Sequence, residues 1–368
     1  MSLHDLHMAR RTLLASGLAV TAVGAVGIPA SAAQRATAAP SISTTSDWEA
    51  RDPSSSVDVL DSKPNKIIVH HTATPNSDDT SQSHAFALCR SIQNYHMDSN
   101  GWLDTGQNFT NSRGGHLMEG RHKSLNALEG GSQHVLGAHA GEQNSVALGI
   151  ENEGTYTEAS VPSALWNALV ELCSYMISQY GIDASAIYGH RDYMSTACPG
   201  DVLYQRLPEL RTEVALATAQ SEPVTPAVWP LLTPEARGPR VTAAQLLLRS
   251  HGGRVPVNGV FDVDTRRAAQ VFLDAHRPHR VECSATRTPE RDLFGGTAWT
   301  SLAPVLSERA TGDAVRAAQA VLTSRGHHAS GEDGFGARTV DAVRRFQARQ
   351  GLPTTGVVDH PTWQRLLG

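Results

Sequence analysis

The stretch Lys66-Ile67-Ile68-Val69-His70 decides the fold of the first part of this chain. It is rich in β-branched residues and directly follows Pro64-Asn65. A short apolar run that begins after turn residues is typical of a buried strand. We therefore predict a buried strand here, around which the neighbouring elements pack.

Helical and strand-like segments alternate along the chain around this strand. Residues 82–97 carry apolar residues at helical spacing. Residues 163–180 form a clearer helix, because Pro162 stands at the start, Gly181 follows the end and one apolar stripe runs between them. Strand-like segments lie at residues 107–110, 146–151 and 186–190. This interleaving predicts an α/β domain with a mixed central β-sheet flanked by helices.

The N-terminus has the composition of an export signal. Arg10-Arg11 precedes an apolar stretch that ends near Ile28, and small residues follow up to Ala33. Paired arginines before such a run indicate the twin-arginine route, so residues 1–33 are predicted to be a signal peptide that leaves no membrane segment after cleavage. The alternative is an uncleaved anchor, although the run is shorter than the roughly 20 residues that span a bilayer. Residues 34–46, rich in Ala, Ser and Thr, are predicted to be a flexible leader.

The last third of the chain contains an internal repeat. Val241-Thr-Ala-Ala-Gln245 recurs as Val315-Arg-Ala-Ala-Gln319, a shift of 74 residues. Each copy has the pattern of two helices joined by a Gly-rich turn and is too small to bury much surface alone. We predict two small all-α helical modules, at 239–304 and 305–368, which pack together or stand apart. The Pro-rich segment 217–238 is predicted to be a semi-extended linker.

Charge and cysteine content narrow the possible partners. The formal net charge of -5 provides no basic field for nucleic acid, so we expect none as a partner. An exported chain can form disulfides, and Cys89 and Cys173 each lie on the apolar side of an expected helix. A bridge between them and two buried free thiols are the two alternatives, with Cys283 as a further thiol. No heptad pattern or long apolar surface indicates an oligomer, so we expect a monomer.

Two separated segments carry residues that bind metals. His70-His71 ends the buried strand, and neighbouring strand residues point to opposite faces, so only one of the two can face a given site. Gly189-His190 follows a second apolar stretch, and Cys198 comes eight residues after His190. Zinc accepts imidazole nitrogen and thiolate sulfur, and catalytic zinc sites use three protein ligands and a water molecule. Core histidines and a buried cysteine explain the same residues, and their spacing alone does not decide between these hypotheses.

A series of motifs covers essentially the whole first domain. They are Lys66-Ile-Ile-Val-His-His-Thr-Ala73, Gly101-Trp102, Met118-Glu-Gly-Arg121, Gly137-Ala-His-Ala140, Leu148-Gly-Ile-Glu151, Gly189-His-Arg-Asp192 and Thr196-Ala-Cys-Pro-Gly200. With these motifs, residues 47–210 resemble the peptidoglycan recognition protein and type 2 N-acetylmuramoyl-L-alanine amidase family. The resemblance implies a zinc amidase domain at 47–216 that cuts the amide bond between N-acetylmuramic acid and L-alanine of peptidoglycan.

The resemblance also assigns roles to residues of the expected site. It implies that His70, His190 and Cys198 bind Zn²⁺, which selects His70 over His71. Thr196 matches a position where the family places a polar residue beside the reacting carbonyl, so it is expected to donate a hydrogen bond to the oxyanion. Asp192 is a candidate for orienting His190 through the second ring nitrogen.

The chain departs from the family pattern at Gln107, where many amidases carry a tyrosine. Glutamine cannot act as an acid or base, although its amide can donate to an oxyanion. Glu151 aligns with a carboxylate that part of the amidase branch uses as general base, and we expect that role here. The alternative is a carboxylate that only bonds loop backbone. His139 and Asn144 are expected to line the substrate groove, and structural roles explain them equally well.

The second copy of the repeat closely resembles the helical peptidoglycan-binding module, with Gly331-Glu-Asp-Gly-Phe-Gly336 and Pro361-Thr-Trp363. The first copy is a looser match, and its segment 276–298 departs from the pattern. Phe335 and Trp363 are either core residues or ligand contacts. Together with the export signal, these modules predict a secreted, wall-associated protein whose partner is peptidoglycan.

Two other functions compete with amidase activity. A non-catalytic peptidoglycan receptor would be consistent with the loss of the tyrosine at Gln107. The complete set of His70, His190 and Cys198 argues against it, because family members that only bind tend to lose a ligand. A zinc D,D-carboxypeptidase with the same tail modules lacks the central motifs.

Overall fold

The computed structural model describes residues 38–276, 290, 292–329 and 334–368. The predicted signal peptide (1–33) and Cys283 lie outside these residues. Among the helices that are described, none is both long and apolar enough to cross a bilayer.

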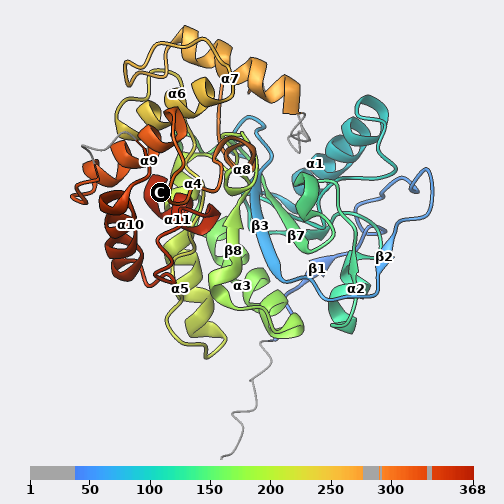
Figure 1. Cartoon of the computed structure of the whole chain (residues 1–368). Helices are drawn as coiled ribbons and strands as arrows, with labels where there is room; N and C mark the ends of the chain where they lie inside the picture. The colour runs from blue at the N-terminus through green and yellow to red at the C-terminus, as the bar shows by residue number, and fades with distance from the viewer. Residues whose placement is uncertain (1–37, 277–289, 291, 330–333) are drawn as a thin grey trace, which may run out of the picture. The chain divides into compact units, whose positions relative to one another are not determined.

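A six-stranded sheet forms the centre of the first domain, in the order β1-β5-β4-β7-β3-β8. The strands are β1 (Ile42–Ser43), β5 (Leu117–Glu119), β4 (Phe109–Asn111), β7 (Ala147–Asn152), β3 (Lys66–His71) and β8 (Ile187–Gly189). Only the pair β4–β5 is antiparallel, and every other neighbouring pair is parallel. The strand expected at Lys66–His70 is therefore the fifth strand of the sheet, between β7 and β8 (Figure 1). A separate antiparallel pair joins β2 (Val59–Leu60) to β6 (His134–Val135).

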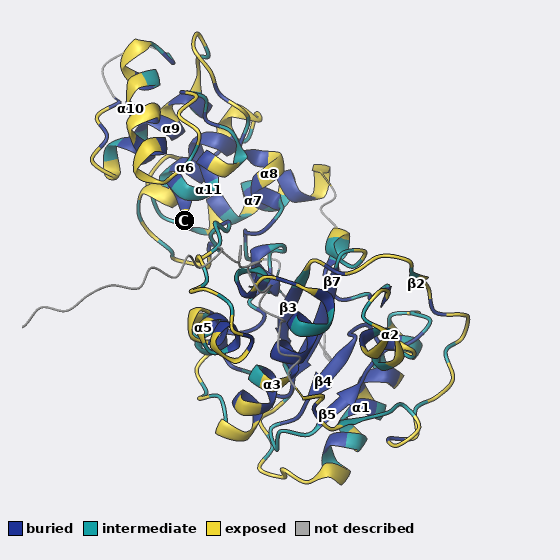
Figure 2. Cartoon of the chain, turned by 90° about the horizontal axis from the view of Figure 1, so that it is seen from below, coloured by how far each residue is buried: buried dark blue, intermediate teal, exposed yellow. Residues whose placement is uncertain are grey.

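Helices cover both faces of this sheet, as the sequence pattern predicts for an α/β domain. Side chains of Ile67 and Val69 in β3 pack in one core with α3 (Ser163–Tyr180) and α5 (Leu207–Ala217). On the other face, α1 (Gln82–Asn94) packs Cys89 against Met118 and Trp48. Figure 2 shows β3, β4 and β7 as buried strands among partly exposed helices. The prediction of a mixed sheet flanked by helices is confirmed.

Short elements connect these layers. They are the π-helical turn η1 (Tyr95–Ser99), α2 (Ser124–Gly130), the 3-10 turns η2 (Gly141–Gln143), η3 (Ala184–Ala186) and η4 (His190–Asp192), and α4 (Asp201–Gln205). The helix expected at 163–180 has these bounds in the structure, with Gly181 ending it at a φ of 72°. The helix expected at 82–97 ends at Asn94, where the chain widens into the π-helical turn η1.

The two cysteines considered for a bridge lie on opposite faces of the sheet. Cys89 belongs to the cluster under α1, and Cys173 belongs to the core under α3. Both are free and buried, which confirms the thiol alternative. Burial raises the pKa of both thiols, in the case of Cys89 to about 12.

The prediction of a flexible leader at 34–46 is wrong at its C-terminal end. Ile42 and Ser43 form β1, which pairs in parallel with Leu117 and Met118. Asp47 accepts hydrogen bonds from the backbone and side chain of Thr44, so the turn after β1 is also ordered. The Ala/Ser/Thr composition hides a strand because only two residues join the sheet edge.

The tail consists of two copies of one helical unit. The first copy contains α6 (Pro239–Ser250), α7 (Val263–His276) and α8 (Ala298–Leu302), and the second contains α9 (Asp313–Ser324), α10 (Ala337–Arg349) and α11 (His360–Leu367). The bounds of α6 and α9 differ by 74 residues at both ends, as the repeat predicts. A buried glutamine bonds a threonine hydroxyl in each copy, through Gln245 to Thr265 and Gln319 to Thr339.

Both copies share one continuous hydrophobic core, in which α6 packs against α9. Phe335 and Trp363 are 1% and 0% exposed, so both are core residues. The predicted boundary at 238/239 is wrong, because Trp229 and Leu232 of the expected linker are buried in this core. The Trp299 indole also donates to the carbonyl oxygen of Pro230. Apolar side chains among the prolines thus make residues 229–238 part of the first copy.

The first copy is longer than the second between its last two helices. The bond from Trp299 to Pro230 corresponds to the bond from Trp363 to Pro304. The prolines are 74 residues apart and the tryptophans only 64, so the first copy contains ten additional residues. The additional residues lie between α7 and Trp299, in the part of the chain that departs from the repeat pattern.

Candidate metal centre and active site

Three side chains from two separated segments of the sequence meet at the end of strands β3 and β8. In these parallel strands Val69 pairs with Gly189, so the next residues, His70 and His190, lie side by side. Their ring centroids are 4.4 Å apart. Cys198 lies on the loop that follows η4, and its Sγ is 3.7 Å from Nδ1 of His70. One ligand atom of each of the three residues lies within 4.8 Å of the others.

This arrangement fits a zinc ion. Tetrahedral zinc with bonds of about 2.0–2.3 Å places its ligand atoms roughly 3.3–3.8 Å apart, which is the separation of the thiol and the His70 ring. The backbone N–H of His71 points at Cys198 Sγ from 3.3 Å and would stabilise a thiolate there. Burial, followed by the charges of neighbouring histidines, lowers the pKa of His70 well below its usual value and that of His190 to about 3. Both rings are therefore neutral at pH 7, as metal ligands must be.

His139 lies directly behind His70, on the same face of the sheet. Its Nδ1 is 3.0 Å from Nε2 of His70, and its side chain is completely buried. Gly137 and Gly149 leave room for the ring, because a Cβ at either position would lie 2.5 Å from it. Asn144 holds the His139 loop by accepting hydrogen bonds from the backbone of His139 and Ala140. His139, expected in the substrate groove, thus contacts the candidate metal ligand His70. Asn144, expected in the same groove, holds the loop that carries His139.

Glu151 occupies the β7 position that pairs with His70 of β3. Paired residues of parallel strands point to the same face, so the Glu151 side chain lies on the face that carries His70. The carboxylate is 0% exposed. Its other neighbour in the sheet is Thr110, whose hydroxyl accepts from the amide of Gln107 at 2.9 Å. Gln107 is itself 1% exposed, and its side-chain oxygen accepts a hydrogen bond from Thr105. The oxygen and the nitrogen of its side-chain amide therefore both form hydrogen bonds within the protein.

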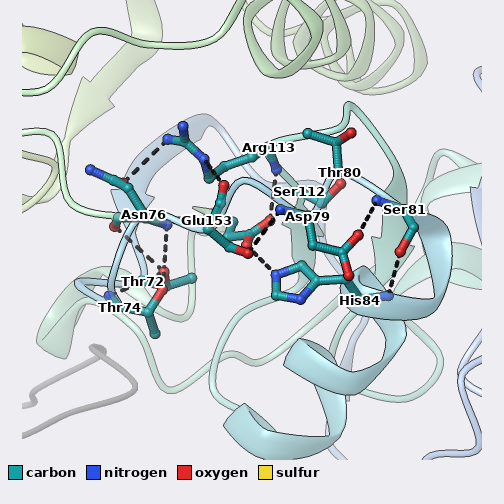
Figure 3. A network of polar contacts seen from close by, with 12 residues as sticks. Thr72, Thr74, Asn76, Asp79, Thr80, Ser81, His84, Ser112, Arg113 and Glu153 are labelled. Carbon is teal, nitrogen blue, oxygen red and sulfur yellow. Dashed lines mark hydrogen bonds and ion pairs between the residues drawn. The ribbon is translucent and has the colours of Figure 1, made fainter.

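A second buried carboxylate, Glu153, follows β7. Its Oε1 is 2.6 Å from Nε2 of His84 in α1, and its Oε2 accepts from the backbone N–H of Arg113 (Figure 3). The Arg113 side chain continues the network to Asn76 and the carbonyl oxygen of Ser77. These bonds occupy both oxygens of Glu153, so the network ties α1 to the loops at this edge of the sheet.

Thr196 lies two residues before Cys198 and contacts the tail. Its hydroxyl accepts from the backbone N–H of Cys198 at 3.0 Å and donates to Oε1 of Glu290 at 2.8 Å. Asp192, the candidate for orienting His190, bonds the turn that precedes this residue. Its carboxylate accepts from the backbone N–H of Gly189 and from the Tyr204 hydroxyl, so it holds the turn that carries His190.

The sequence did not predict the contacts of His139 with His70 and of Glu290 with Thr196. The sequence does contain a signal for the position of His139. Gly137 lies in the same motif and Gly149 in the next one, and glycines often mark places where another group packs closely against the backbone. For Glu290 the sequence offers none, since the contact joins residues 94 positions apart.

Comparison with protein families matches two parts of the chain. Residues 60–201 match the model for N-acetylmuramoyl-L-alanine amidase. Residues 311–366 match the model for a peptidoglycan binding domain. The first match contains all three candidate ligands and the second falls on the second copy of the repeat.

Two similar proteins from animals show the extent of the likeness. Peptidoglycan-recognition protein SC1a of Drosophila melanogaster is 33% identical over 141 residues, which are 38% of this chain and 70% of that protein. The N-acetylmuramoyl-L-alanine amidase of Homo sapiens is 32% identical over 143 residues, 38% of this chain and 23% of that protein. Among solved structures, Drosophila PGRP-LB is 26% identical with a TM-score of 0.40, over 50% of this chain and 96% of that one.

Proposed function

The chain belongs to the family of peptidoglycan recognition proteins and N-acetylmuramoyl-L-alanine amidases, and from this premise we propose that it is a zinc-dependent peptidoglycan amidase. The bond cut is the amide between N-acetylmuramic acid and the L-alanine of the stem peptide. The observation that carries this proposal is the meeting of two neutral imidazoles and one thiol within 4.8 Å of one another. Three such ligands leave a fourth position for water or substrate, as catalytic zinc sites do.

In this proposal His70, His190 and Cys198 hold the ion. When bound, zinc lowers the pKa of a coordinated water to roughly 7 and polarises a carbonyl oxygen. His139 orients His70, because a hydrogen bond to the outer ring nitrogen fixes which nitrogen faces the metal. His70 then presents Nδ1 to the ion, the nitrogen that lies 3.7 Å from the thiol.

Glu151 is the proposed general base. It is a fully buried carboxylate on the sheet face that carries His70. A carboxylate in such a position can take the proton of the attacking water and pass it to the leaving nitrogen. Thr196 is the proposed donor to the oxyanion of the tetrahedral intermediate. Gln107 and Asn144 are proposed to hold the loops around the substrate groove through their internal hydrogen bonds.

The tail is proposed to retain the enzyme on the cell wall outside the cell, after export by the twin-arginine route. Tethering a hydrolase to a wall-binding module raises the substrate concentration around its site, even when the module binds weakly. The mature enzyme is proposed to act as a monomer without membrane or nucleic acid.

Digestion of purified sacculi tests the activity. The purified chain should contain about one zinc per molecule and release L-alanine amino termini together with free lactyl carboxylates. A chelator should stop the release, and added Zn²⁺ should restore it. Cys198→Ser should lose both the metal and the activity, whereas Cys173→Ala, which removes an equally buried thiol far from the site, should keep both. A metal-free protein that binds sacculi without product would instead be a receptor.

A further inference from the structure

The tail reaches the loop that carries Thr196 through a segment of its longer first copy. Ser195 and Gly295 bond twice, since the Ser195 hydroxyl donates to the Gly295 carbonyl and accepts from the Gly295 N–H, both at 3.0 Å. The N–H of Thr297 donates to the carbonyl oxygen of Tyr193 at 2.9 Å. These bonds place residues about 100 positions apart in direct contact.

Gly296 shows that this contact depends on a close approach of two backbones. It has a φ of 54° in the left-handed region. A Cβ added there would lie 2.2 Å from the backbone N of Met194 and the backbone C of Tyr193. A larger residue at this position would therefore push the segment off the loop.

Glu290 uses this contact to bring a carboxylate to Thr196. One oxygen, Oε1, accepts from the Thr196 hydroxyl at 2.8 Å and from the Ala197 N–H at 2.9 Å. The Thr196 oxygen already accepts from Cys198 N–H, so its own proton is directed at Glu290. Two donors that converge on one oxygen, next to a metal ligand, have the arrangement of an oxyanion hole.

We propose that the Thr196 hydroxyl and the Ala197 N–H form an anion pocket for the oxygen of the scissile carbonyl, and that Glu290 occupies it in the resting enzyme. The proposal rests on the amidase function argued above. A charged carboxylate bonds such donors more strongly than a neutral carbonyl does, and its tether keeps it at a high local concentration. Substrate must displace Glu290 before the pocket can stabilise the tetrahedral oxyanion. In this proposal Glu290 makes the first copy inhibit the enzyme until substrate binds.

The test compares Glu290→Ala with the wild-type full chain on a soluble muropeptide. Removal of a tethered competitor should lower KM, and we expect kcat/KM to rise about tenfold with unchanged zinc content. Gly296→Ala should have a similar effect by displacing the segment. Glu308→Ala, an exposed carboxylate of the second copy, should leave the kinetics unchanged.

Hydrogen exchange of the peptide that covers residues 193–198 supplies a second readout. The Ala197 amide should exchange faster in Glu290→Ala than in wild type, and at the wild-type rate in Glu308→Ala. Equal exchange in all three proteins would mean that the contact does not form, and would overturn the proposal. Faster exchange with unchanged or lower kcat/KM would overturn it as well, because Glu290 would then only position Thr196. Absence of turnover in every variant would instead refute the amidase function itself.

Discussion

Single side chains around the candidate metal centre divide into those that would hold the ion and those that would move protons. Glu151 belongs to the second group, because it shares a sheet face with His70 without being one of the three clustered ligands. Glu151→Gln keeps the shape of the side chain and removes the basic oxygen. We expect full zinc content and a loss of kcat by about 10²–10⁴-fold, measured on muropeptides alongside metal analysis. Activity near wild type would assign the base elsewhere.

The His139 ring occupies space that is free only because Gly149 has no side chain. Gly149→Ala would place a Cβ 2.5 Å from the ring, which would push His139 away from His70. Loss of such a supporting bond typically weakens metal affinity by 10–100-fold. We expect a weaker Zn²⁺ affinity of about this size in a competition titration with a chromogenic chelator. Gly130→Ala is the control, since a Cβ there meets no atom within 4 Å. Equal affinities in both variants would contradict a positioning role for His139.

A partly buried ion pair between Asp104 and His122 links stability to pH. Asp104 Oδ2 lies 2.9 Å from His122 Nδ1, and this bond raises the pKa of His122. Burial opposes ionisation of Asp104, but its hydrogen bonds outweigh this and lower its pKa. A histidine whose pKa is higher in the folded than in the unfolded state stabilises the fold. This contribution is complete at pH values below the unfolded pKa of about 6.5, and it is lost as the pH rises through the folded pKa.

His122→Asn should therefore lower the melting temperature most near pH 6 and less at pH 9. The expected cost near pH 6 is about 1.5–3 kcal/mol, typical of a hydrogen bond to a charged group. Thermal melting from pH 5 to pH 9 measures it. A cost that is the same at pH 6 and at pH 9 would contradict the role of this ion pair.

At the scale of elements, the helices α7 and α10 occupy equivalent places in the two copies but differ in charge. Exposed arginines of α10 are Arg338, Arg344, Arg345 and Arg349. The residues 74 positions earlier are Asp264, Gln270, Val271 and Ala275. None of the four arginines forms an ion pair with a residue that the structure describes. The free carboxylates of a cell wall would therefore meet more exposed positive charge on α10 of the second copy than on α7 of the first.

Charge reversal at Arg345 and Arg349 tests this difference. The double change to glutamate should lower the retention of the protein on sacculi several-fold at low salt, with a smaller effect at high ionic strength because salt screens exposed charges. A double change of Arg254 and Arg267 to glutamate, on exposed positions of the first copy, is the matched control and should retain binding. Equal loss in both pairs would mean that net charge, and not α10, governs adsorption.

At the scale of the whole molecule, the shared core makes the two copies one cooperative unit. Leu247 of α6 is fully buried in the core that also contains α9. Leu247→Ala should cost about 2–5 kcal/mol. Hydrogen exchange should accelerate in α9 as well as in α6, while β3 and β7 keep their protection. Acceleration confined to α6 would show that the copies unfold separately.

Local sequence patterns were sufficient for much of the fold. Pro162 and Gly181 mark the ends of α3, and the β-branched run at Lys66–His70 marks β3, because such signals act within a few residues. The motif resemblance identified the family, and the 74-residue shift identified the paired helices α6 and α9. Composition misled at Ile42–Ser43 and at Trp229, where a sheet edge and a remote core order residues that look like leader and linker.

By itself the sequence determined which residue types are available for chemistry and in which elements they lie. Alternation along β3 left His70 and His71 equivalent, and only the tertiary structure brings His70 together with His190 and Cys198. The same holds for His139 behind His70 and for Glu290 against Thr196. These contacts join residues 69 to 128 positions apart, so they exist only after the sheet has paired and the tail has packed. No local propensity encodes them, because their energy comes from burial and from hydrogen bonds that form in the folded chain.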